Sequence, residues 1–225
     1  MAETTHTLDT AHGHHGHSMA LRHHFASSGQ QKEASTLGMW VFLVGDAMSF
    51  GTLLAAYGAI RYGSADWPKP YDVLGIWLTA AMTLLLIVSS VWMVKGLAAI
   101  QRNDYAAFRK FIGLTILGGV IFLACQAYEW THLIHEGLGL TSWTLHTKTG
   151  EVLTGASLFG TTFFIITGFH GMHVTGGVIY LLCILLRGMS GAYSANNYSP
   201  VEIAGLYWHF VDLVWIMVFT FVYLI

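Results

Sequence analysis

Charged side chains are scarce in this chain of 225 residues. Asp, Glu, Lys and Arg make up 10% of it, whereas hydrophobic residues make up 54%. Soluble domains carry on average about 25% charged residues, so the chain lies outside that class. The formal net charge of −2 leaves no basic excess that would attract nucleic acid. The composition therefore predicts an integral membrane protein and excludes a nucleic-acid-binding one.

Cysteine is also nearly absent. The two cysteines, Cys125 and Cys183, lie in separate apolar runs. They supply neither a disulfide framework nor the ligands of a thiolate zinc site. The N-terminus lacks the charged and then apolar pattern of a cleavable signal peptide. We therefore expect the first membrane-spanning helix to direct insertion.

Five apolar segments approach or exceed the roughly 20 residues that cross a hydrocarbon core of about 30 Å. Backbone polar groups cannot stay unpaired in lipid, and no alternating strand pattern is present, so these segments are predicted to be helices. The expected fold is an all-α bundle of five transmembrane helices. The predicted spans cover residues 37–60, 73–94, 111–128, 158–186 and 203–225.

Basic residues between the spans predict the orientation, because Lys and Arg are retained on the cytoplasmic side. Most of them, such as Lys95, Arg109 and Arg187, lie on the same side as the N-terminus. We therefore expect a cytoplasmic N-terminus and a C-terminus outside.

Residues 1–36 precede the transmembrane domain, residues 37–225, and contain more than half of the 13 histidines. Clustered imidazoles can bind a divalent metal ion. A histidine-rich tract without a fixed scaffold is more typical of a flexible segment. We therefore expect a disordered cytoplasmic tail.

Asp46 is an ionisable residue inside the first apolar segment. Placing Asp at the centre of a membrane helix costs about 2.5–3.5 kcal/mol on insertion scales, so such residues normally face other protein. Small neighbours, including Gly45 and Ser49, favour close contact with another helix. Two interpretations stay open: a hydrogen bond that packs two helices together, and a carboxylate that influences proton uptake nearby.

Two polar pairs with a spacing of three residues lie in the last two apolar segments: His170 with His173, and His209 with Asp212. Residues three apart share a helix face. Two histidines on one face cannot ligate a haem from opposite sides, and His209 is the only other histidine in mid-membrane, so one haem stays conceivable and two haems do not. Structural or lipid-headgroup hydrogen bonding is favoured over metal binding. His209 and Asp212 can bond each other or share a partner on a neighbouring helix, which favours a structural role over a proton relay.

Glu129 and His132 form an E-x-x-H motif near the outer end of the third apolar segment. Di-iron carboxylate bundles use this motif, but they need a second copy and two further carboxylates on facing helices. The other four apolar segments hold no second copy. A polar cap at the membrane interface is therefore favoured over a di-iron site.

Several sequence segments resemble those of subunit III of the haem-copper respiratory oxidases. Two signature helices of that family resemble the segments FFIITGFHGMHVTGG and YWHFVDLVWIMVFTFVYL. Two further family segments match LGMWVFLVGDAMSF and QAYEW, in the same order. The resemblance covers residues 37–225. Members with seven helices carry two more before the helix that corresponds to 37–60, so the chain resembles the five-helix bacterial form.

The resemblance implies roles for the polar residues. Asp46 stands where the family usually has Glu and would support proton uptake. No catalytic or metal-binding residue is implied in this chain. The remaining polar positions would serve internal bonding or lipid-headgroup contact: Glu129, His170, His173, His209 and Asp212.

The same resemblance implies a non-redox accessory subunit of a proton-pumping terminal oxidase. Haem and copper would belong to partner subunits, with subunit I as the main contact and subunit II beside it, and bound phospholipid is expected. The location would be the bacterial cytoplasmic membrane. A larger respiratory supercomplex, and cytochrome c or quinol as the electron donor, stay open.

Two further functions stay open on sequence grounds. A subunit of a related nitric oxide reductase would co-purify with a different catalytic partner. A membrane di-iron or haem enzyme would carry stoichiometric iron in the isolated chain.

Overall fold

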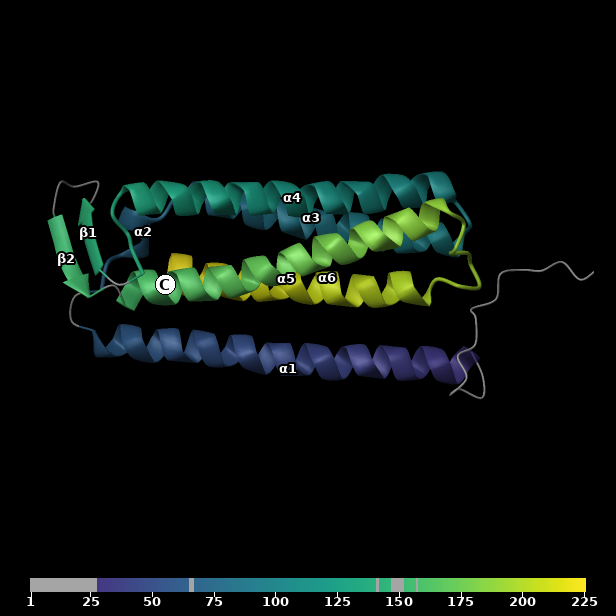
Figure 1. The fold of residues 1–225 in the computed structure, drawn as a ribbon, viewed down its shortest axis with the longest axis horizontal. Helices are drawn as coiled ribbons and strands as arrows, with labels where there is room; N and C mark the ends of the chain where they lie inside the picture. The colour runs from purple at the N-terminus through teal and green to yellow at the C-terminus, as the bar shows by residue number, and fades with distance from the viewer. Residues whose placement is uncertain (1–27, 65–66, 141, 147–151, 157) are drawn as a thin grey trace, which may run out of the picture.

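Five long helices run side by side along one axis (Figure 1). The computed structural model describes residues 28–64, 67–140, 142–146, 152–156 and 158–225. Each long helix is apolar enough to cross a membrane, which confirms the prediction of an all-α bundle with five spans. They are α1 (Ser28–Gly63), α3 (Ile76–Gln101), α4 (Tyr105–His135), α5 (Leu158–Met189) and α6 (Ser199–Val218).

Shorter elements gather at one end of the bundle. The turn α2 (Pro70–Val73) precedes α3, and the π-helical turn η1 (Phe219–Leu224) continues α6. Strands β1 (Ser142–His146) and β2 (Val152–Ala156) pair as an antiparallel hairpin at the same end, between α4 and α5 (Figure 1). The hairpin was not predicted, because an apolar-segment search detects spans and not short strands in a connection.

The helices are longer than the predicted spans. α1 already includes residues 28–36, which were assigned to the tail, and α4 continues to His135 where the predicted span ends at 128. Hydropathy marks the part of a helix that crosses hydrocarbon, whereas polar residues with good helix propensity, such as Gln31 and Lys32, extend it into the interface. Residues 1–27 of the predicted tail lie outside the described part of the chain.

Four of the helices form the main packed group. α3 packs along α4, α5 packs against α4 and α6, and α6 also packs against α3. Their contact surface is aromatic, with Trp208 and Trp215 of α6 fully buried. Gly119 of α4 allows the closest approach, because a Cβ there would lie 2.7 Å from both the Trp208 and the Val178 side chains.

α1 lies at the edge of this group, where it contacts α6 and α5 (Figure 1). Only 11% of its most apolar stretch is buried, compared with 33–44% for the other four helices. Val41 and Met48 are among its exposed apolar side chains. The position of α1 therefore depends on few contacts, and the polar ones among them are described next.

Candidate functional site

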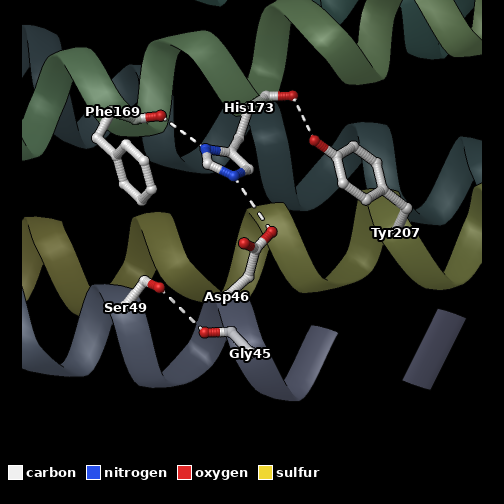
Figure 2. Close-up of polar contacts among 6 residues, drawn as sticks. All are labelled: Gly45, Asp46, Ser49, Phe169, His173 and Tyr207. Atoms are coloured by element: carbon white, nitrogen blue, oxygen red, sulfur yellow. Dashed lines mark hydrogen bonds and ion pairs between the residues drawn. The ribbon is translucent and has the colours of Figure 1, made fainter. Parts of the chain in front are cut away.

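Asp46 of α1 faces His173 of α5 (Figure 2). The distance between Asp46 Oδ2 and His173 Nε2 is 3.2 Å, and the two side chains are 15% and 9% exposed. The small neighbours Gly45 and Ser49 do not explain this approach, because both are exposed and a Cβ on Gly45 would meet nothing within 4 Å. Asp46 is therefore not a lone carboxylate: it lies within ion-pair distance of a histidine on a neighbouring helix.

The other ring nitrogen of His173 restricts where protons can lie. Nδ1 is 2.7 Å from the Phe169 carbonyl oxygen (Figure 2). A carbonyl oxygen only accepts, so Nδ1 carries a proton and donates it. A neutral ring in this tautomer would point the Nε2 lone pair at an ionised carboxylate, which is repulsive. The contact therefore favours one further proton held between His173 and Asp46, on Nε2 or on the carboxyl group.

A third helix meets this pair. The Tyr207 hydroxyl of α6 donates a 2.9 Å hydrogen bond to the His173 carbonyl oxygen (Figure 2). Phe50 of α1 lies edge-on to the His173 ring, with ring centroids 5.2 Å apart. The site thus joins α1, α5 and α6 through a polar contact, a hydrogen bond from a side chain to a backbone carbonyl, and aromatic contacts.

His170 lies one turn before His173 and is fully buried. Its ring is 4.8 Å from that of Trp215 and 5.7 Å from that of Phe122. Neither ring nitrogen has a hydrogen-bond partner among the described residues. Both histidines approach Phe50, as a shared helix face predicts. Complete burial favours the structural alternative over headgroup contact for His170.

His209 and Asp212 of α6 share one partner, Ser90 of α3. The Ser90 hydroxyl donates a hydrogen bond to Asp212 Oδ2 and lies 3.0 Å from His209 Nδ1. A hydroxyl has one proton to donate, so His209 Nδ1 is the donor to Ser90. The alternative of a shared partner on a neighbouring helix is therefore the one that the structure shows. The cluster joins α3 to α6.

Glu129 is buried in the bundle, with 4% exposure, and does not form an interface cap. Its carboxylate accepts hydrogen bonds from the Tyr223 hydroxyl at 2.8 Å and from the Thr79 hydroxyl at 3.1 Å. The Gln126 amide lies at 3.4 Å from the same group. The interface-cap interpretation failed because α4 does not end near 128, which places Glu129 against α3 and η1.

The E-x-x-H motif does not converge on one site. His132 is exposed and pairs with Glu136, one turn later, at 3.5 Å, whereas Glu129 turns toward Tyr223. Within the described part of the chain, no group of three or more His, Cys, Asp or Glu side chains is placed to hold a metal ion.

The neutral partners of these polar residues were not predicted from the sequence. Ser90, Thr79 and Tyr223 each complete a cluster from a helix or turn distant in the sequence. Hydroxyl side chains are common in membrane helices and give no signal by themselves. Two buried indoles also have hydroxyl partners on a distant helix. Trp208 donates to Ser89 and Trp215 donates to Thr83, each at 3.0 Å.

Comparison with known proteins identifies the family. The family model for cytochrome c oxidase subunit III matches residues 21–225. The chain belongs to the cytochrome c oxidase subunit III family. A subunit 3 from Synechocystis sp. is 38% identical over 99% of this chain and 83% of the relative. Those from Alkalihalophilus pseudofirmus and Corynebacterium diphtheriae are 32% and 35% identical over 84% of this chain, and the matches cover 85% and 87% of the two relatives.

The family confirms the resemblance on which the expected role depends. A subunit III is one component of an oxidase complex with other subunits, and the five apolar spans make this chain a multi-pass membrane protein.

Proposed function

We propose that the chain is a non-redox accessory subunit of a proton-pumping haem-copper terminal oxidase. Its role is to support assembly, to hold phospholipid and to sustain proton uptake by the catalytic subunit. Subunit I is the main partner and subunit II a further one, and these partners carry haem and copper. The relatives described above are named for cytochrome c oxidase, which favours cytochrome c as the electron donor.

The observation that carries this proposal is the Asp46–His173 pair. It lies between α5 and α1, the long helix whose most apolar stretch is the least buried. With one proton shared between them, the Asp46 carboxyl and the His173 ring have a net charge of zero. No isolated charge then remains in the membrane. Docking of α1 through this pair gives the partner a fixed helix surface beside its proton entrance.

The location follows from the same role. We propose the bacterial cytoplasmic membrane, with the N-terminus on the cytoplasmic side and the C-terminus outside. The support is the excess of Lys and Arg at the end of the bundle where α3 meets α4, which includes Arg102, Arg109 and Lys110.

The test compares Asp46→Ala with the native complex in oxygen consumption over many turnovers. We expect an unchanged initial rate and subunit composition, followed by a severalfold faster loss of activity. Asp46→Glu, the residue that the family usually has there, should restore sustained turnover. Ser49→Ala is the matched control, because the Ser49 hydroxyl only bonds the Gly45 carbonyl of its own helix at 3.1 Å.

Two results would overturn the proposal. Activity that decays in Asp46→Ala at the native rate would remove the role in sustained uptake. Haem or iron that stays on this chain after the large partners are stripped away would show that the chain itself is redox-active.

A further inference from the structure

A groove with a volume of about 250 Å³ opens between α1 and α6, which pack side by side. Apolar side chains form most of its walls, among them Val44 of α1 and Leu213 of α6, and both are exposed. His209 is the one residue with an ionisable side chain among those that line it. We call this feature the α1–α6 groove. A polar group at such a place is costly without a partner, because hydrocarbon offers it none.

The two ring nitrogens of His209 have different surroundings. Nδ1 donates to the Ser90 hydroxyl of α3, as described above. Nε2 is bonded by none of the described residues, and protein atoms do not enclose it. A positive ring would be costly beside lipid, so His209 is neutral here. With its proton on Nδ1, the ring has a lone pair on Nε2, which can accept a hydrogen bond and has none to donate.

The depth of His209 restricts what can donate to Nε2. His209 lies about 9 Å inside the last predicted span, residues 203–225, at a rise of 1.5 Å per residue. Lipid headgroups and bulk water stay outside the hydrocarbon, and acyl chains carry no donor. The donor therefore belongs to a molecule that enters the hydrocarbon region itself.

The size of the groove favours a side chain over a small molecule. Pockets for small molecules measure roughly 300–1,000 Å³, and this groove lies below that range. Its α1 wall belongs to the long helix whose most apolar stretch is the least buried. Subunit III is one component of an oxidase complex, so helices of other subunits lie beside the bundle. A helix that packs along α1 and α6 can fill the groove with one side chain.

We propose that a transmembrane helix of a neighbouring oxidase subunit lies in the α1–α6 groove and donates a hydrogen bond to His209 Nε2. The donor is a side chain with a hydroxyl, indole or amide group. Ser90 acts as a positioning residue, because its bond to Nδ1 fixes the tautomer that leaves Nε2 free to accept. The inference rests on the proposed membership of an oxidase complex and names a contact surface within it. It does not depend on a role of Asp46 in proton uptake.

The first test locates the neighbour in the intact complex. The photoreactive residue p-benzoylphenylalanine replaces Leu213, an exposed residue of the groove wall. We expect a covalent adduct with another subunit, and mass spectrometry should place it in a transmembrane segment that carries a hydroxyl, indole or amide side chain. The matched control is the same replacement at Leu117 of α4, which is exposed but does not line the groove. It should give no adduct with that segment.

The second test removes the acceptor. In His209→Asn the amide nitrogen takes the place of Nδ1 and can still donate to Ser90, but no atom replaces Nε2. We expect the chain to bind its partner subunits about three- to tenfold more weakly, as for the loss of one interhelical hydrogen bond. His209→Gln places an amide near the position of Nε2 and should keep most of the affinity. The control is His132→Asn at an exposed histidine of α4, which should bind like the native chain.

The affinity is measured as the fraction of the chain retained on immobilised partner subunits in rising detergent. Retention of His209→Asn equal to that of the native chain would overturn the proposal. Adducts from position 213 with lipid or a quinone alone, or with a segment that lacks a donor side chain, would also overturn it. The crosslink decides the matter if His209→Asn does not fold. Failure here differs from failure of the proposed function, which is measured as the decay of activity in Asp46→Ala.

Discussion

The Glu129 cluster gives the most direct test of how buried polar groups stabilise this bundle. Tyr223→Phe removes the shortest of the hydrogen bonds to the carboxylate, the 2.8 Å contact at Oε2. The ring remains and can keep its contacts with Phe163 and Trp215. The variant therefore removes a hydroxyl and little else.

The expected loss follows from what remains at Glu129. Thr79 still donates to Oε1, but Oε2 keeps only the Gln126 amide at 3.4 Å. A buried acceptor that loses its partner costs about 1–3 kcal/mol in the free energy of unfolding. Measurements on interhelical bonds in membrane proteins are smaller on average, about 0.6 kcal/mol, so we expect a loss near the lower end, about 1 kcal/mol.

The assay is unfolding of the purified chain in mixed detergent micelles, followed by circular dichroism. Tyr62→Phe is the matched control, because Tyr62 is 96% exposed and its variant should change the free energy of unfolding little. A Tyr223→Phe variant as stable as Tyr62→Phe would refute the reasoning. Glu129→Gln combined with Tyr223→Phe completes a double-mutant cycle, in which a coupling energy near zero would also refute it.

Two further predictions concern α3 and α4. Ser90→Ala leaves the buried Asp212 carboxylate without its hydroxyl partner and should lower the free energy of unfolding by about 1–3 kcal/mol, whereas the exposed Ser49→Ala should have little effect in the same titration. Gly119→Ala should cost about 1–3 kcal/mol through overpacking, because its Cβ would meet two side chains at 2.7 Å. Gly113→Ala is its control, since a Cβ there meets nothing within 4 Å and the variant should be as stable as the native chain.

The five helices of the bundle could be predicted from sequence, because each one is specified by the residues of its own segment. A run of apolar residues long enough to cross hydrocarbon specifies a helix wherever it occurs, so all five spans were found. The ends of the helices could not be found in this way, since hydropathy stops at the membrane surface and helices do not. The error at Glu129 has this origin: the predicted end at 128 placed on the surface a residue that lies inside the helix α4.

The polar residues of the clusters could be predicted, but their partners could not. Asp46, His173 and Asp212 are conspicuous because an ionisable side chain in an apolar run is costly. Ser90 and Tyr223 are ordinary residues in such runs, and their role depends on which helices meet. That information lies in packing between residues far apart in the chain, which a single sequence does not display.

The position of α1 follows from the balance of forces in a membrane. Lipid is as apolar as the helix surface, so apolar burial alone does not drive α1 against the bundle. Two polar contacts hold it there, Asp46 with His173 in the middle of the helix and the ion pair of Lys32 with Glu202 of α6, at 2.9 Å, near its start. The second pair is more than one-third exposed and contributes little, because water screens exposed pairs. The docking of α1 therefore depends most on Asp46 and His173, and loss of that contact is expected to loosen the helix before it unfolds the rest of the bundle.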